Sequence, residues 1–242
     1  MSTNSYANIK DVLKVHPEGA VATARGLLRM GVSRETQRSL VRSGWLKRMG
    51  SGAYSVLDQA PGLDGALYAL QHDLKLSIHE GGFSALAARH GKAHNLVGNR
   101  PVQLFGVRGE NTPTWFARGF GDLFSLHRAS AFPPDLGIVD LDSGGFELKV
   151  SGPERAMMEL LYLVPAVHTL REAYQIMELL DVAKPAIIQS LLESCGSVKV
   201  KRLFLYMAEL AGHAWFRRLD LARVDLGTGD REIVKGGKLD RK

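Results

Sequence analysis

Residues 21–44 read VATARGLLRMGVSRETQRSLVRSG, and this stretch predicts two short helices joined by a tight turn. Thr23 and Ser33 suit the N-cap position, because a hydroxyl there accepts a hydrogen bond from an otherwise unpaired amide of the first turn. Gly31 and Gly44 can adopt the left-handed backbone conformation that ends a helix. The first helix therefore ends two residues before the second is capped, which is the spacing of a helix-turn-helix.

The second of these helices has two different faces. Gln37, Leu40 and Val41 share one side at the helical spacing. The exposed side carries the residues that we predict to contact DNA from this helix: Ser33, Arg34, Glu35, Arg38, Ser39 and Arg42. Arginines spaced four apart repel one another by roughly 0.2–0.5 kcal/mol per pair, a cost that a bound polyanion removes. Arginines near the start of such a helix commonly hydrogen-bond guanine with both arms of the fork.

A β-hairpin is predicted directly after this helix. WLKRM (residues 45–49) and AYSV (53–56) have strand composition, and GSG (50–52) forms the turn between them. A hairpin in this position is a wing, and we expect Lys47 and Arg48 to contact phosphates and Ser51 to belong to the same DNA-binding surface. Trp45 and Tyr54 are expected in the core of the hairpin rather than against bases. Residues 1–58 are thus predicted to form a winged helix-turn-helix DNA-binding domain.

The rest of the chain, residues 63–242, predicts a larger mixed domain, so the fold class is α+β. Strands are expected over residues 101–107, 114–118, 123–128 and 146–150. Helices are expected over residues 5–15, 66–76 and 84–90, and again from Pro153, Thr169, Pro185 and Ser197.

The charge distribution points to an anionic partner. The net charge is +6, but residues 1–60 hold nine Lys and Arg against four Asp and Glu, and residues 199–242 hold eleven against six. The segment between them is acidic. We therefore predict a possible second basic surface, with a solvated helix face as the equal alternative: Lys199, Lys201, Arg202, Arg217, Arg218 and Arg223.

The composition argues against a membrane protein, a secreted protein and a disulfide-bonded protein. No apolar run approaches the length of a membrane span, and the N-terminus lacks the apolar core of a secretory signal. The single cysteine, Cys195, excludes an internal disulfide framework and fits a reducing cytoplasm. We expect a cytoplasmic protein that does not contact membranes.

The strongest enzyme signal is a Pro-Asp…Glu-x-Lys string made by Asp135, Glu147 and Lys149. Nucleases hold Mg²⁺ with such carboxylates and place the lysine near the attacking water. Asp135 lies in a turn-like PPDLG run, however, and the eight histidines give no set with zinc-ligand spacing. We expect no catalysis, no cofactor and no metal. A winged-helix-guided nuclease remains the alternative, and a protein that binds an acidic partner through its basic ends is a third hypothesis.

Residues 21–54 resemble the N-terminal winged helix of the AbiEi antitoxins through Thr23-Ala-Arg, Gly31, Ser33-Arg-x-Thr36, Leu40-Val-Arg-Ser-Gly44 and Gly52-x-Tyr54. Gln37 departs from that pattern, which usually has an apolar residue there. The later runs SGPERA (151–156), VKVKRLFLY (198–206), DLGTGDR (225–231) and GGKLD (236–240) resemble the same family.

The resemblance implies a repressor and antitoxin of abortive-infection, phage-defence type. Its winged helix would bind inverted repeats in double-stranded DNA at the promoter of its own toxin–antitoxin operon, as a monomer in solution or a dimer on DNA. Its C-terminal domain would counteract a nucleotidyltransferase-like toxin. The system would be of type IV, in which antitoxin and toxin need no stable complex.

Overall fold

The computed structural model describes residues 16–56, 59–91 and 100–229, and the helix predicted over residues 5–15 lies outside them. The chain divides into two compact units. The first contains Met1–His79, Gly109–Ser125 and Asp140–Lys149; the second contains Glu80–Arg108, Leu126–Val139 and Val150–Lys242. The predicted domain border at residues 58–63 stays a prediction.

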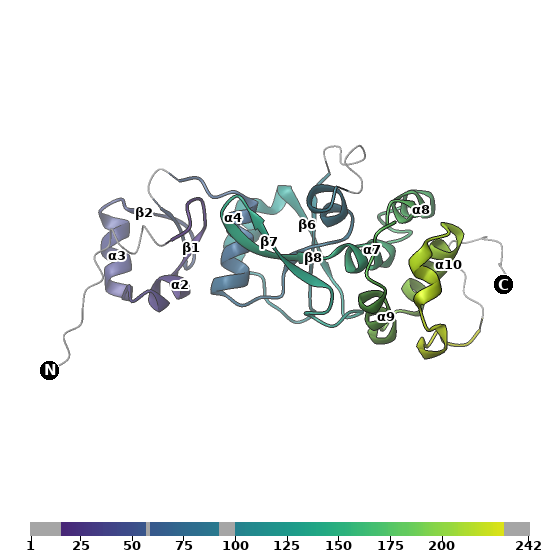
Figure 1. The fold of residues 1–242 in the computed structure, drawn as a ribbon. Helices are drawn as coiled ribbons and strands as arrows, with labels where there is room; N and C mark the ends of the chain where they lie inside the picture. Colours follow the sequence, from purple (N-terminus) through teal and green to yellow (C-terminus); the bar gives the residue numbers. More distant parts are fainter. Residues whose placement is uncertain (1–15, 57–58, 92–99, 230–242) are drawn as a thin grey trace. The chain divides into compact units, whose positions relative to one another are not determined.

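The first part of the chain forms a winged helix-turn-helix (Figure 1). Its elements are β1 (Ala22–Thr23), α2 (Ala24–Arg29), α3 (Arg34–Arg42), β2 (Leu46–Gly50) and β3 (Ala53–Val56). The three strands form one antiparallel sheet in the order β1-β3-β2. Leu27, Leu40 and Leu46 lie in the small core between the helices and this sheet.

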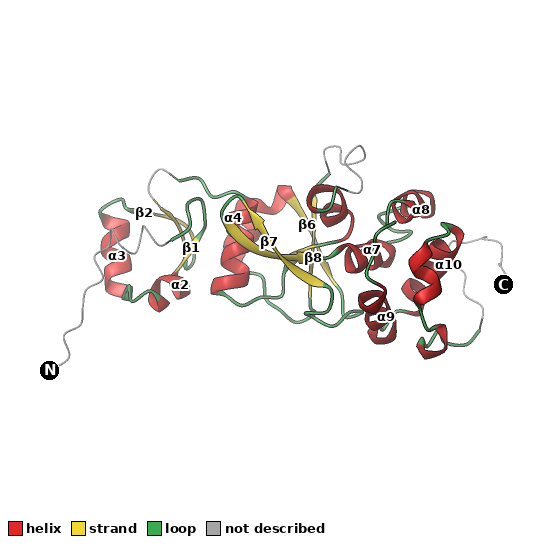
Figure 2. Ribbon diagram, viewed as in Figure 1, coloured by secondary structure: helices red, strands yellow, loops and turns green. Residues whose placement is uncertain are grey.

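The middle of the chain contains a five-stranded sheet in the order β6-β5-β4-β8-β7, drawn in yellow in Figure 2. Glu80 of β4 pairs in parallel with Val150 of β8. The elements here are α4 (Leu63–Tyr68), the π-helical turn η1 (Ala69–Asp73), β4 (His79–Glu80), α5 (Gly82–Ser84), η2 (Ala85–Arg89), β5 (Val102–Gly106), α6 (Thr114–Phe120), η4 (Gly121–Leu123), β6 (Phe124–Arg128), β7 (Ile138–Ser143) and β8 (Phe146–Ser151).

One secondary-structure prediction in this region is wrong. Residues 114–118 were expected to form a strand, but they begin helix α6. The aromatic residues that favoured a strand are instead buried on one side of the helix, at Trp115, Phe116 and Phe120. Burial within the first unit decides the local structure here and overrides the strand preference of the individual residues.

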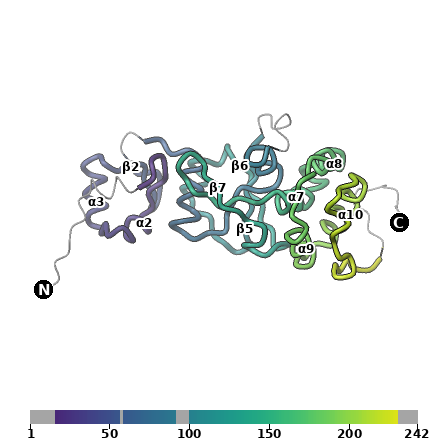
Figure 3. The backbone as a smooth tube through the Cα atoms, in the orientation of Figure 1, coloured from purple at the N-terminus to yellow at the C-terminus, as the bar shows by residue number. Residues whose placement is uncertain are grey.

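The last part of the chain is helical, as Figures 2 and 3 show. Its elements are α7 (Pro153–Tyr162), α8 (Leu170–Glu178), α9 (Pro185–Ser194), α10 (Val198–Leu210), η5 (Ala214–Arg218) and η6 (Leu221–Arg223). Thr169 and Ser197 cap α8 and α10 as predicted. Apolar side chains of α7 to α10 form the main core of the second unit, among them Leu160, Ile176, Leu191 and Phe204. Strands followed by helices give the α+β class that the sequence predicts.

Candidate nucleic-acid interface

The helix-turn-helix is built from the caps and turns that the sequence specifies. The Thr23 hydroxyl accepts a hydrogen bond from the amide of Gly26, and the Ser33 hydroxyl accepts one from the amide of Thr36. Gly31 and Gly44 end α2 and α3 with φ of +84° and +83°. A side chain at either glycine would be strained, so both turns depend on glycine.

Gln37 fixes how α3 is rotated about its own axis. Its side chain is buried, with 1% of its surface exposed. Its Nε2 donates to the carbonyl oxygens of Ala24 and Val32, at 3.2 and 3.0 Å. The glutamine at this position, where the family pattern usually has an apolar residue, therefore links α3 to α2 and to the turn through two hydrogen bonds. Its Oε1 is buried and has no hydrogen-bond partner among the described residues.

With Gln37 and Leu40 facing inward, the opposite side of α3 faces solvent. Arg34, Arg38 and Arg42 are exposed, and none of them forms an ion pair or side-chain hydrogen bond with any described residue. All nine residues predicted to contact DNA are exposed: Ser33, Arg34, Glu35, Arg38, Ser39, Arg42, Lys47, Arg48 and Ser51. The structure thus presents three unpaired guanidinium groups along one helix.

The wing follows at once, and one of the two predictions about its aromatic residues is wrong. Leu46 pairs with Val56 and Arg48 pairs with Tyr54; Leu46, Val56 and Tyr54 are buried, whereas Arg48 is exposed. Tyr54 is buried as predicted, and the Arg48 guanidinium lies 6.0 Å from the centre of its ring. Trp45 was expected in the core but is 39% exposed. Trp45 lies in the bend that precedes β2, and Leu46, the first residue of the strand, is the buried one.

A buried carboxylate outside the winged helix anchors α2. Asp73, at the end of η1, accepts hydrogen bonds from the Thr23 hydroxyl at 2.7 Å and from the Arg29 guanidinium at 2.6 Å. A Cβ atom on Gly26 would lie 2.3 Å from the Asp73 carboxylate, so glycine is required for this approach. Sequence analysis missed Asp73; a glycine inside a helix was the available signal.

The residues of the predicted second basic surface have different environments. The Lys199 ammonium donates to the carbonyls of Tyr162 and Val164, at 2.7 and 2.5 Å, and burial lowers its pKa. Lys201 is buried, and Arg202 donates to three backbone carbonyls of residues 226–229. Arg223 pairs with Glu193. Arg217 and Arg218 are exposed and unpaired among the described residues, and DNA binding by this group stays a prediction.

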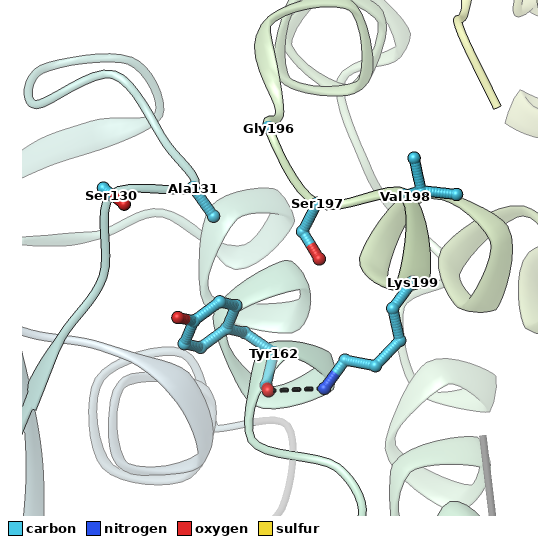
Figure 4. A pocket seen from close by; sticks show the side chains of 7 residues that line it. All are labelled: Ser130, Ala131, Tyr162, Gly196, Ser197, Val198 and Lys199. Atoms are coloured by element: carbon cyan, nitrogen blue, oxygen red, sulfur yellow. Dashed lines mark hydrogen bonds between the residues drawn. The ribbon is translucent and has the colours of Figure 1, made fainter. Parts of the chain in front are cut away.

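Figure 4 shows Lys199 at the edge of a cavity of about 390 Å³ in the second unit. The cavity is also lined by Ser130, Tyr162 and Ser197. The hydrogen bond from Lys199 to the carbonyl of Tyr162 places this ammonium at the C-terminal end of α7, where carbonyl groups lack helical partners. Lys199 therefore acts as a helix cap.

The SGPERA run (151–156) begins a buried charge network in the second unit. Glu159 is fully buried and accepts hydrogen bonds from Arg155, Ser151 and the amide of Gly82. Arg155 also donates to the carbonyl of Leu136. Each charge has partners, as burial requires. Ser151 and Arg155 of this run therefore hold the fold together through buried hydrogen bonds.

His168 belongs to a second buried network. Its Nδ1 lies 3.1 Å from Glu172, and its Nε2 lies 2.7 Å from Nε2 of Gln103. The other amide atom of Gln103 accepts the N–H of Phe83, so Nε2 is the donor to the imidazole and His168 is neutral. Burial lowers the pKa of His168 and outweighs the raising effect of Glu172.

Nothing in the described ranges supports the metal site of the nuclease alternative. They contain no cluster of three or more His, Cys, Asp or Glu side chains that could hold a metal ion. The Lys149 ammonium lies 3.1 Å from Asp140 in an exposed ion pair. Asp135 lies in the connection before β7 rather than in a strand.

The capped helices, the short turn and the wing define the N-terminal part as a winged helix-turn-helix of a transcriptional regulator. Residues 5–97 match the family described as "Transcriptional regulator, AbiEi antitoxin N-terminal domain". Residues 99–242 match "Transcriptional regulator, AbiEi antitoxin, Type IV TA system". The chain belongs to the AbiEi antitoxin family.

The fold is similar to that of the RV2827C protein from Mycobacterium tuberculosis, known from a crystal structure. The TM-score is 0.56 at 16% sequence identity, over 93% of this chain and 82% of that one. No functionally curated protein sequence matches the chain. Among the described residues, none of the helices has the length and apolar character needed to cross a bilayer.

Proposed function

We propose that this antitoxin represses its own operon by placing α3 in the major groove of the promoter DNA. The observation that carries the proposal is the unpaired stripe of Arg34, Arg38 and Arg42 on a helix whose rotation is fixed by the buried Gln37. A phosphate backbone relieves the repulsion within the stripe, and guanine offers two acceptors to an arginine at the start of the helix. Lys47, Arg48 and Ser51 contact phosphates beside the groove.

Two copies bind an inverted repeat. A single winged helix buries limited surface, so specific affinity requires two half-sites. Half-sites read by one face of the duplex are separated by about one helical turn, roughly 10 base pairs or a multiple of it. The copies either meet first on DNA or bind as a dimer that exists beforehand.

A gel-shift titration tests the repressor proposal. The full chain is titrated on DNA from upstream of its own gene and on a scrambled duplex of the same length. Arg34→Ala/Arg38→Ala is the test variant, and Arg108→Ala/Arg171→Ala is matched to it in charge, because both control arginines are exposed, are unpaired among the described residues, belong to the second unit and lie outside both predicted DNA-binding surfaces. We expect preference for the upstream DNA, lost only in the test variant. Equal weak binding to both duplexes would refute the proposal.

We propose further that the C-terminal part counteracts a nucleotidyltransferase-like toxin encoded beside it. The family assignment supports an antitoxin role. The test is co-expression with the neighbouring gene in a host whose growth that gene arrests. We expect growth to be restored by the full chain and equally by Arg34→Ala/Arg38→Ala, since neutralisation does not use α3. Continued arrest with the unaltered chain would contradict this role.

A further inference from the structure

Helix α6 packs against the wing. A Cβ atom on Gly50, the last residue of β2, would lie 2.6 Å from Cβ of Trp115 and 3.3 Å from its Cα. The backbone of the wing and that of α6 are therefore in direct contact, and only glycine allows it. Both segments belong to the first compact unit.

The position of α6 beside the wing is held by aromatic contacts. Trp115 is 3% exposed, and its ring meets those of Phe116 and Phe120 edge-on, at 5.8 and 6.4 Å between centres. Phe116 stacks on Phe124 at 4.6 Å. A helix held by three buried aromatic side chains keeps its exposed residues at fixed positions relative to the wing.

Arg118 is the cation that α6 exposes. It lies three residues after Trp115, about 60° around the helix from it and less than one turn along the axis. It is exposed and forms no ion pair or side-chain hydrogen bond with any described residue, including Asp122 four positions later. Arg118 thus adds an unpaired guanidinium to the helix whose Trp115 contacts Gly50 at the end of the wing strand β2.

We propose that Arg118 is a DNA-backbone contact, so that the DNA-binding surface is composite. The wing lies in the segment that matches the N-terminal domain of the family, and α6 lies in the segment that matches the C-terminal domain. The inference rests on the proposed repressor function and extends it. A guanidinium on the helix that packs against the wing contacts phosphate and not base edges, so it contributes affinity without reading sequence.

Salt dependence measures this contact. Each phosphate that a protein neutralises on duplex DNA adds about 0.9 to the slope of log affinity against log salt. The full chain and Arg118→Ala are titrated on upstream and scrambled DNA between 50 and 200 mM salt. For Arg118→Ala we expect the slope to fall by about 0.9 per bound protomer, equally on both DNAs, with the preference for upstream DNA retained.

Arg171→Ala is the matched control, because Arg171 is an exposed arginine in α8 of the second unit and has no partner among the described residues. Its slope should equal that of the unaltered chain. If Arg118→Ala also keeps the unaltered slope, the composite surface is refuted while the repressor function stands. If the unaltered chain shows no preference for upstream DNA, the repressor function fails, and the slopes on scrambled DNA still decide whether Arg118 contacts phosphate.

Discussion

Replacing Gly26 with alanine should destabilise the winged helix, although alanine is the better helix former. Gly26 lies inside α2, where the exchange alone would stabilise the protein by about 1 kcal/mol. The new methyl group would lie 2.3 and 2.5 Å from the two carboxylate oxygens of Asp73. Such an overlap cannot persist, so either Asp73 or α2 must move.

The cost follows from what Asp73 holds. Overpacking a buried site costs typically about 1–3 kcal/mol. Displacing the carboxylate also weakens its hydrogen bonds to Thr23 and Arg29, and a hydrogen bond to a charged group contributes about 1.5–3 kcal/mol. Against a gain of about 1 kcal/mol from helix propensity, we expect a net loss of about 2–4 kcal/mol in the free energy of unfolding.

A double-mutant cycle identifies the cause. Gly26→Ala, Asp73→Ala and the double variant are unfolded in urea in a Trp215→Phe background, so that the remaining tryptophans, Trp45 and Trp115, both report on the first unit. In the absence of the Asp73 carboxylate, Gly26→Ala should be neutral or stabilising by up to about 1 kcal/mol. An equal loss in both backgrounds would refute the clash with Asp73 as its cause.

Two predictions concern the second unit. Because the folded pKa of His168 lies below the value of 6.5 for a free imidazole, its contribution to stability is complete above pH 6.5 and is lost as the pH falls through the folded pKa. Urea midpoints should therefore drop between pH 7.5 and 5.5, and less so in His168→Gln; parallel pH profiles for the two proteins would exclude His168 as the titrating group. Glu159→Ala leaves the buried Arg155 without its carboxylate and should cost about 3–5 kcal/mol, with a smaller loss in Glu159→Gln, measured by urea unfolding. A cost below about 1 kcal/mol for the alanine variant would show that the Arg155–Glu159 ion pair does not stabilise the folded state.

Local signals predicted the winged helix well. Capping hydroxyls at Thr23 and Ser33 and glycines at Gly31 and Gly44 act within a few residues of their own position, so the sequence alone shows them. Gln37 could be placed on the inner side of α3 by helical spacing. Its two carbonyl partners could not be predicted, because they depend on how α2 packs across the turn.

Features that depend on distant residues were missed. Asp73 acts on α2 across more than forty residues of sequence, and the burial of Trp115 against the wing turns a strand-like run into α6. The second basic surface was predicted from charge counts alone. That prediction did not show that the Lys199 ammonium caps the C-terminal end of α7. A count of charges does not show which of them already have partners inside the fold.

Methylation interference on the upstream DNA tests most directly the central claim, that α3 reads bases in the major groove. N7 of guanine lies in that groove, and a methyl group there blocks an arginine fork. The account predicts interference at guanines in two half-sites about one helical turn apart, and its loss at the contacted guanine in Arg34→Ala or Arg38→Ala. Interference confined to the minor-groove N3 of adenine, or a pattern unchanged in both variants, would contradict it.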